Sequence, residues 1–448
     1  MNTKTMDARE AAFKTLEAYR RSKAWPDLTL GALIDIYSIT ERDAALATHI
    51  ASGVMQNMAL LDYYVASFSS LPLKKIQPNV LDVLRLSVYQ IVFLTKVPHR
   101  ASVDQGVALA KRHSNPRAAG FVNADLRKAA HAAEDGLLPE VTADSELMRL
   151  SIQYSHPEWL VEMLCERLGC DGAEALLAAN NAQDTPVFAN VNTLQANVGD
   201  VLYSLEIDGV QADRHEWLDD CIELRGSGKL RRLRSLIDGD IYIQDPASRL
   251  AVIAAGVKPG DFVIDGCSAP GGKAFAAAIS MRDRGRIAAC DVSAKKLHLV
   301  EDGAARLGLG IIEAVERDAS ESFEGFAGRA DVVLADVPCS GFGIIRKKPE
   351  IRYKSEHDVS VFPEAQKRIL STLAQYVKPG GSLLYSTCTV LRRENEDVVD
   401  SFLGENAMFS REAFTLPGIG EVPDGMITLW PHIHGTDGFF ICRFRRGM

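Results

Sequence analysis

Two cysteines stand directly after apolar runs that predict buried strands. Cys339 lies in residues 336–341 (DVPCSG) and Cys388 in residues 386–389 (STCT). A cysteine thiolate is a strong nucleophile that can form a covalent bond to a substrate and later leave it. Because parallel strands end at one edge of a sheet, both thiols are expected at the mouth of the same crevice.

The other cysteines show no pattern of a metal or redox site. None of the 8 cysteines belongs to a C-x-x-C pair, so neither zinc nor a redox dithiol is indicated, and we expect no metal. A lone cysteine is most often a small buried hydrophobic residue. We assign that role to Cys165, Cys170, Cys221, Cys290 and Cys442.

A glycine-rich turn, residues 265–273 (DGCSAPGGK), follows a predicted strand and opens a helix. Ligands of such sheets bind beyond the strand ends, where glycines let the backbone approach them closely. The turn has neither G-x-G-x-x-G spacing nor a Walker A pattern, which disfavours a dinucleotide or a triphosphate. Three acids, Asp291, Asp318 and Asp336, stand at or just beyond further strand ends. An acid after the second strand suits a ribose diol, so the pattern favours a nucleoside cofactor.

The elements that must position these residues alternate between strand and helix. This alternation predicts a doubly wound, Rossmann-like α/β domain over residues 239–448. The predicted strands are 262–265, 287–291, 311–315, 332–335 and 382–386, and the helices between them include 293–307 and 359–377.

The first part of the chain is predicted to be entirely helical. Thr40 can cap one helix and Pro78 can open another, with apolar residues at helical spacing after each. Residues 136–145 read as a linker. We therefore expect an all-helical domain at 1–135 and a small α+β module at 146–238, before the sheet.

Length and composition indicate a globular protein of several domains. The chain has 448 residues, of which 47% are hydrophobic and 24% charged. No apolar run is long enough to predict a membrane span, and the first residues lack the apolar core of an export signal. A reduced, cytoplasmic protein is the expectation.

The formal net charge of −9 does not by itself favour nucleic acid, although two segments gather cations. Local patches decide binding, yet a single basic cluster is more often a solvated surface. The charge pattern permits RNA as a partner without establishing it. The first segment holds Arg225, Lys229, Arg231, Arg232 and Arg234, and the second holds Arg346, Lys347, Lys348, Arg352 and Lys354.

Several further motifs are spread over nearly the whole chain: 120–127 (GFVNADLR), 155–160 (SHPEWL), 244–248 (QDPAS), 336–353 (DVPCSGFGIIRKKPEIRY), 393–396 (RENE) and 434–440 (HGTDGFF). Together they resemble the RsmB (Sun) group of RNA cytosine-C5 methyltransferases. The resemblance implies a NusB-like RNA-binding domain at the N-terminus, S-adenosylmethionine as cofactor and small-subunit (16S) ribosomal RNA as substrate. A monomer is favoured, with no membrane partner.

The resemblance also implies roles for the candidate residues. The nucleophile falls on Cys388, whereas Cys339 matches the cysteine linked to product release. Spacing alone leaves open which thiol attacks. The cofactor contacts fall on Cys267, Ser268, Ala269, Pro270, Gly271, Gly272 and Lys273, with Asp291, Asp318 and Asp336.

The chemistry of this family explains why a thiol is needed. Cytosine C5 is a poor nucleophile until a thiolate adds to C6 and pushes electron density onto C5. Asp336 could hydrogen-bond or protonate N3 while charge develops on the ring. A base must then remove the C5 proton before the thiolate leaves.

Some positions depart from the usual family pattern, and three other classes of function compete. Ala274, Phe342 and the pair 392–393 differ from common residues, and Phe342 is expected to reshape the base pocket. An amino-group methyltransferase would leave Cys388 without a task. In a DNA cytosine methyltransferase, resemblance to that class implies attack by Cys339, the cysteine of the Pro-Cys motif. The third alternative, an RNA-binding adaptor with an inert domain, is opposed by the intact reacting groups.

Overall fold

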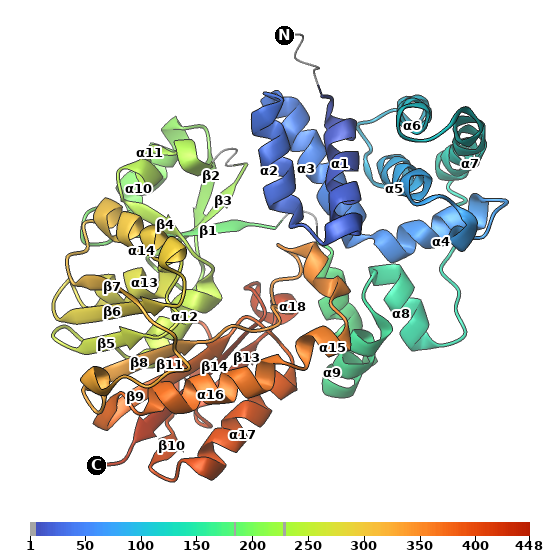
Figure 1. Ribbon diagram of the computed structural model, residues 1–448. Helices are drawn as coiled ribbons and strands as arrows, with labels where there is room; N and C mark the ends of the chain where they lie inside the picture. The colour runs from blue at the N-terminus through green and yellow to red at the C-terminus, as the bar shows by residue number, and fades with distance from the viewer. Residues whose placement is uncertain (1–5, 183–184, 227–229) are drawn as a thin grey trace. The chain divides into compact units, whose positions relative to one another are not determined.

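The computed structural model describes residues 6–182, 185–226 and 230–448 (Figure 1). The chain forms two compact units. The first consists of Met1–Gln183 together with Ile345–Lys354, and the second of Asp184–Ile344 with Ser355–Met448. Each unit is described by itself below. No helix among the described residues has both the length and the apolar character needed to cross a membrane.

The first unit is a bundle of helices, as the apolar periodicity predicts. Thr40 caps its helix by accepting a hydrogen bond from the Asp43 N–H, and Pro78 opens another, so both predicted helix starts are confirmed. The elements are α1 (Ala8–Ser22), α2 (Pro26–Ile36), α3 (Glu41–Gln56), α4 (Met58–Phe68), η1 (Leu73–Lys75), α5 (Pro78–Phe93), α6 (His99–His113), α7 (Pro116–Glu134), α8 (Glu146–Tyr154) and α9 (Glu158–Asn180).

The core of this unit is closely packed. Phe13, Ile50 and Leu84 are buried in one apolar cluster with residues of most of the helices. Helix α3 lies so close to the Tyr89 side chain of α5 that a Cβ at Gly53 would lie 1.9 Å from the ring. Glycine at this position is therefore required by packing.

A short segment from the second half of the chain, Ile345–Lys354, belongs to the first unit. It contains the 3-10 helix η4 (Pro349–Tyr353). Arg352 is fully buried there, and its Nη1 donates to the Gln56 carbonyl at 2.6 Å and to the Asn181 Oδ1 at 2.8 Å. Burial lowers the pKa of Arg352 to about 10. Tyr353 donates its hydroxyl to the Met55 carbonyl at 2.6 Å, so both side chains hold the end of α3.

Replacing Arg352 by methionine is expected to lower the free energy of unfolding by about 2 to 3 kcal/mol, because the buried carbonyls would lose a charged donor. The midpoint of urea-induced unfolding, followed by circular dichroism, measures the effect. Arg100→Met is the matched control, because Arg100 is 93% exposed and faces Asp104 at 3.8 Å. It should change stability by less than about 0.5 kcal/mol. Equal midpoints for the two variants would contradict a role of Arg352 in stability.

The second unit begins with a small antiparallel sheet of strand order β2-β3-β1-β4. Val191, Leu205 and Ile222 belong to its own apolar cluster. This module confirms the predicted small α+β part. Its elements are β1 (Val187–Val191), α10 (Val198–Ile207), β2 (Gln211–Arg214), β3 (Cys221–Arg225), η2 (Leu230–Arg232), α11 (Arg234–Ile237) and β4 (Ile241–Ile243).

The large sheet has the order β10-β14-β9-β8-β5-β6-β7, with β13 paired to β14. Strands β9, β8, β5, β6 and β7 are parallel, whereas β14 runs antiparallel to β9. The Rossmann-like class is confirmed. The strands are β5 (Phe262–Asp265), β6 (Arg286–Asp291), β7 (Ile312–Glu316), β8 (Ala330–Asp336), β9 (Val377–Thr387), β10 (Phe409–Arg411), β11 (Phe414–Leu416), β12 (Gly420–Val422), β13 (Met426–Leu429) and β14 (Phe439–Arg446).

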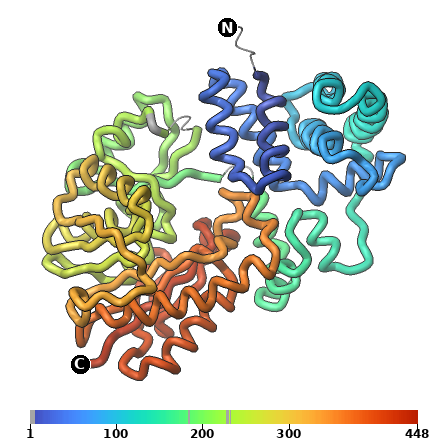
Figure 2. Tube along the Cα trace, in the orientation of Figure 1, coloured from blue at the N-terminus to red at the C-terminus, as the bar shows by residue number. Residues whose placement is uncertain are grey.

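Helices cover both faces of this sheet. In Figure 1, α12, α13 and α14 lie on one face and α16 and α17 on the other, and the Cα trace in Figure 2 shows the same layers. Each face has its own buried apolar cluster. The helices are α12 (Pro246–Ala255), α13 (Gly272–Ser280), α14 (Ala294–Leu307), η3 (Glu324–Phe326), α15 (Glu356–Val359), α16 (Phe362–Ala374), η5 (Arg392–Glu394), α17 (Glu396–Glu405) and α18 (Pro431–His434).

Candidate active site

The glycine-rich turn runs from the end of β5 into α13. Gly271 has a φ of +111°, which side chains other than glycine rarely adopt, and a Cβ there would lie 2.4 Å from the Phe275 ring. The Ala269–Pro270 peptide bond is cis. Asp265 is fully buried behind the turn, and burial raises its pKa to about 7. The turn thus has a fixed backbone shape at the carboxyl edge of the sheet.

Asp291 joins the turn to the end of the neighbouring strand β6. Its Oδ2 accepts a hydrogen bond from the Ala269 N–H at 3.3 Å, and its Oδ1 accepts one from the Ser293 N–H at 3.0 Å. An ionised carboxylate has about four acceptor positions. Asp291 therefore keeps acceptor capacity for a ligand beside the turn.

Carboxylates at the strand ends lie close enough to Cys267, within the turn, to act on its thiol electrostatically. Burial raises the pKa of the Cys267 thiol, and Asp265, Asp336 and Asp291 raise it further. These carboxylates converge, as expected for neighbouring strand ends. Asp318 is different, because it is exposed beyond β7 and accepts from the Ser320 N–H at 2.8 Å. No hydrogen bond among the described residues links it to the turn.

Asp336, at the end of β8, is held on both carboxylate oxygens. Lys273 places its Nζ 2.7 Å from Oδ2, and the Ser386 hydroxyl donates to Oδ1 at 2.8 Å. The Lys273 ammonium also lies 5.0 Å from the centre of the Phe439 ring. The orientation of Asp336 is therefore fixed by residues from α13 and β9.

The two candidate thiols lie side by side. The Cys339 and Cys388 sulfur atoms are 3.2 Å apart, which is hydrogen-bonding distance. The hydrogen bond with Cys388 raises the pKa of Cys339 well above its usual value, and burial raises it further. Cys339 is consequently protonated at neutral pH. The expectation that both thiols meet at one edge of the sheet is confirmed by this geometry.

A buried hydroxyl pair joins the two loops that carry these thiols. Ser340 and Thr389, each the residue after a candidate cysteine, are fully buried with their hydroxyl oxygens 2.9 Å apart. Asn395 donates to the Thr389 carbonyl at 2.9 Å and accepts from the Thr387 hydroxyl at 2.6 Å. Sequence reasoning missed the roles of these residues, although Ser340 and Thr389 lie in the two cysteine motifs and Asn395 lies in the motif at 393–396.

Close backbone contacts fix the Cys388 loop from another direction. The Gly343 N–H donates to the Cys388 carbonyl at 2.9 Å, and the Gly438 N–H donates to the Gly343 carbonyl at 2.8 Å. A Cβ at Gly343 would lie 1.7 Å from the Gly438 oxygen. Phe342 beside it is buried, with 2% of its surface exposed. Both glycines belong to motifs quoted above, but the contact between them was not predictable from spacing.

The remaining cysteines follow the prediction in part. Cys221, Cys290 and Cys442 are buried, as predicted. The prediction of burial is wrong for Cys170, which is exposed, and for Cys165, which is half-buried, because both lie on the partly solvated helix α9. No group of three metal-binding side chains is present among the residues that the structure describes.

The chain is similar over its whole length to curated proteins. It is 33% identical to the probable ribosomal RNA small subunit methyltransferase B of Bacillus subtilis (strain 168), over 99% of both chains. The chain belongs to this methyltransferase family. It is also 30% identical to the probable ribosomal RNA small subunit methyltransferase B of Synechocystis sp., over 98% of this chain and 100% of the relative. The predicted membership of the RsmB family is confirmed.

Family models and a solved structure agree with this assignment. Residues 252–445 match the 16S rRNA methyltransferase RsmB/F model, residues 6–131 the NusB family and residues 156–231 the RsmF/B-like ferredoxin-like domain. The crystal structure of a protein called PH0851 superposes with a TM-score of 0.79 at 26% identity, covering 98% of both chains. The NusB-like, small-sheet and Rossmann-like parts of the RsmB family are therefore all present. The boundaries predicted at 135, 146 and 238 stay a prediction.

Proposed function

We propose that this RsmB-family chain transfers a methyl group from S-adenosylmethionine to C5 of a cytidine in RNA. Small-subunit ribosomal RNA, which the relatives' names specify, is the proposed substrate. The observation that carries the proposal is the pair of thiols 3.2 Å apart at the carboxyl edge of the sheet. Transfer to an amino group needs no thiol, so the pair favours a reaction at a ring carbon. The predicted cytoplasmic location is part of this proposal.

The residues around the turn fit S-adenosylmethionine. The fit rests on Asp291, whose carboxylate keeps acceptor capacity for a ribose diol, and on the close-approach backbone at Gly271. Residues 267–273, Asp291 and Asp336 would hold the cofactor. Asp318, which is exposed beyond β7, would contact it from the solvent side. When bound, S-adenosylmethionine supplies an electrophilic methyl group.

The proposed covalent chemistry assigns separate tasks to the two thiols. The Cys388 thiolate adds to C6 of cytosine, and C5 would then bond to the methyl carbon as the bond between that carbon and the cofactor sulfur breaks, which leaves S-adenosylhomocysteine. A base removes the C5 proton, after which the bond between sulfur and C6 breaks and 5-methylcytosine results. Asp336, fixed by Lys273 and Ser386, would deliver a proton to N3 or accept a hydrogen bond from the protonated N3 while charge develops on the ring.

The contact between the two thiols is compatible with Cys388 as the nucleophile. A protonated Cys339 can donate a hydrogen bond to the Cys388 sulfur and so stabilise a thiolate there. The opposite assignment, in which Cys339 attacks as in DNA cytosine methyltransferases, would require ionisation of a buried thiol whose pKa is raised. Cys339 would instead assist release of the product.

The basic segments contribute less to RNA binding than their composition indicates. Arg225 is paired with Glu223 at 2.7 Å, and Arg352 is buried inside the first unit. Lys229 lies outside the described residues. Lys348 lies over the Trp25 ring, 5.4 Å from its centre. The RNA contacts of the first unit are therefore expected near Lys348 rather than at Arg352.

Bisulfite sequencing of ribosomal RNA tests the proposed function. RNA from cells with this chain is compared with RNA from cells without it. The methylated nucleoside that differs between the two samples is also identified by chromatography. In cells without this chain, we expect one or a few cytidines of the small-subunit RNA to become sensitive to deamination by bisulfite. The 5-methylcytidine at these positions should be lost. Identical protection patterns, or loss of an amino-methylated cytidine instead, would overturn the proposal.

Replacing Asp291 by alanine is expected to weaken S-adenosylmethionine binding by about tenfold or more, because hydrogen bonds to a charged acceptor contribute about 1.5 to 3 kcal/mol. Titration calorimetry on the full chain measures the affinity. Asp291→Asn, which keeps one acceptor oxygen, should bind S-adenosylmethionine with an affinity between those of the wild type and Asp291→Ala. Asp302→Ala is the control, because Asp302 is exposed on α14. An affinity of Asp291→Ala equal to that of the control would exclude the ribose contact.

A further inference from the structure

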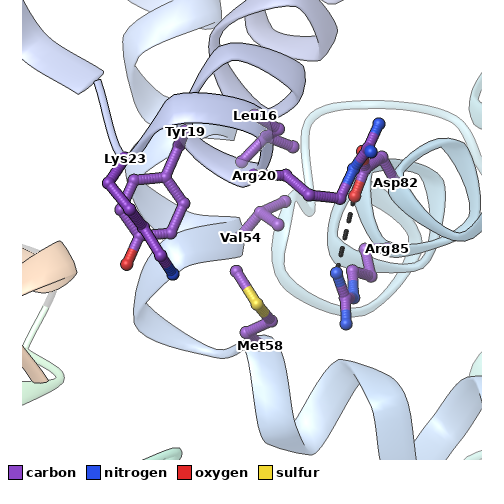
Figure 3. Close-up of a pocket in the computed structure, with 8 residues that line it drawn as sticks. All are labelled: Leu16, Tyr19, Arg20, Lys23, Val54, Met58, Asp82 and Arg85. Carbon is purple, nitrogen blue, oxygen red and sulfur yellow. Dashed lines mark hydrogen bonds and ion pairs between the residues drawn. The ribbon is translucent and has the colours of Figure 1, made fainter. Parts of the chain in front are cut away.

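The first unit contains a pocket that the proposed methyl transfer does not use. It has a volume of about 140 Å³ and lies between the end of α1, the junction of α3 and α4, and α5. Figure 3 shows Tyr19 and Lys23 on one side and Asp82 and Arg85 on the other. The pocket therefore has two different walls, one formed by an aromatic ring with a lysine and the other by an acid with an arginine.

The interior of the pocket suits one flat six-membered ring. Leu16, Val54 and Met58 supply an apolar floor, and the Tyr19 ring supplies a flat wall. An apolar cavity of about 150 Å³ is known to accept a benzene ring. The volume here is close to that value and leaves little room for a fused ring system.

The rim of the pocket carries an excess of positive charge. Arg20 binds Asp82 at 2.7 Å, and Arg85 binds Asp62 at 2.7 Å through two nitrogens. The Lys23 ammonium lies 4.8 Å from the centre of the Tyr19 ring and forms no ion pair among the described residues. Three cations, Arg20, Lys23 and Arg85, thus line the pocket with one acid, Asp82, whereas Asp62 and Glu350 lie outside the lining and Glu350 acts on Tyr19 from there. Lys23 is the cation left for an anionic ligand.

A second pair of aromatic ring and cation lies close in the chain to the first. Trp25, two residues after Lys23, is 50% exposed, and the Lys348 ammonium lies 5.4 Å from its ring centre. Aromatic rings interleaved with cations are the surface that single-stranded nucleic acid needs, because bases stack on rings while cations follow the phosphates. An unstacked nucleotide therefore fits this surface better than a neutral apolar molecule.

We propose that this pocket binds one unstacked pyrimidine base of the RNA substrate, stacked on Tyr19, with Lys23 on the neighbouring phosphate. The inference rests on the proposed function only in taking RNA as the substrate. Sequence-specific proteins commonly read splayed bases of single-stranded RNA in this way. The pocket would make the first unit a reader of substrate sequence, apart from the chemistry of the thiols.

The first test uses the wild-type full chain. A small-subunit ribosomal RNA fragment carrying 4-thiouridine is cross-linked by light, and the modified peptides are identified by mass spectrometry. We expect a cross-link to Tyr19 or Met58 that an excess of the unlabelled fragment removes. Cross-links confined to other parts of the first unit would overturn the proposal, and no variant has to fold for this result.

The second test compares variants in a binding and turnover assay. Tyr19→Leu should weaken RNA binding by about tenfold and Lys23→Gln by about threefold, with KM for RNA raised and kcat unchanged. The controls are Tyr203→Leu and Lys111→Gln, both at exposed positions outside the pocket. Affinities equal to those of the controls would overturn the pocket as an RNA site. Wild-type chain that binds RNA without methylating it would contradict the proposed function and leave the cross-linking result to decide the pocket.

Discussion

Replacing Cys388 by alanine is expected to abolish methyl transfer, lowering the rate by about a thousandfold or more. The expected loss is large because the variant can no longer add to C6, and removal of a covalent nucleophile typically costs this much or more. Transfer of tritium from labelled S-adenosylmethionine to ribosomal RNA in a single turnover measures the rate. Affinity for the cofactor should stay nearly the same.

The control for this variant is Cys170→Ala, which removes an exposed thiol from α9 in the first unit. It should leave the rate within about twofold of wild type. Turnover retained by Cys388→Ala would remove this residue from the mechanism. A loss shared equally by both variants would point to damage unrelated to the proposed adduct.

The Cys339→Ala variant is expected to accumulate a covalent complex between protein and RNA. Cys388 would still add to C6 and the methyl group would still be transferred, but release would lack the thiol that lies 3.2 Å from the attacking sulfur. The complex should survive denaturing electrophoresis, and multiple turnover should fall by about a hundredfold. Radiolabelled RNA makes the slowly migrating band visible.

The double variant Cys339→Ala with Cys388→Ala is the matched control, because it should form no such band. A band that persists in the double variant would show that another residue is attached to the RNA. If Cys339→Ala turns over at the wild-type rate and gives no band, Cys339 has no role in release.

The sheet and its candidate site could be predicted because their signals are local. A buried strand followed by an acid or a cysteine repeats along the chain, and parallel strands bring such ends to one edge. The positions of Asp291, Cys339 and Cys388 follow from that rule. Spacing alone did not separate the two thiols, and the contact between them has no local signal because it joins residues 49 positions apart.

The missed features depend on contacts that no local pattern encodes. Arg352 reads as one cation of a basic cluster, yet it is buried against carbonyls from α3 and α8. Ser340 and Thr389 are small polar residues in loops, where hydrophobic periodicity gives no signal. The predicted helix 359–377 is shorter in the structure, because α16 begins at Phe362 and ends at Ala374.

The segment Ile345–Lys354 makes the two units inseparable by a single cut in the chain. A fragment that starts at residue 185 would retain this segment but lose the helices that receive it. Ile351 and Arg352, both buried in the intact protein, would then face water, 12 and 13 positions after Cys339 in the chain. Loss of activity in such a fragment could not be assigned to lost RNA binding alone. The N-terminal helices therefore also bury a segment of the second half of the chain, Ile345–Lys354.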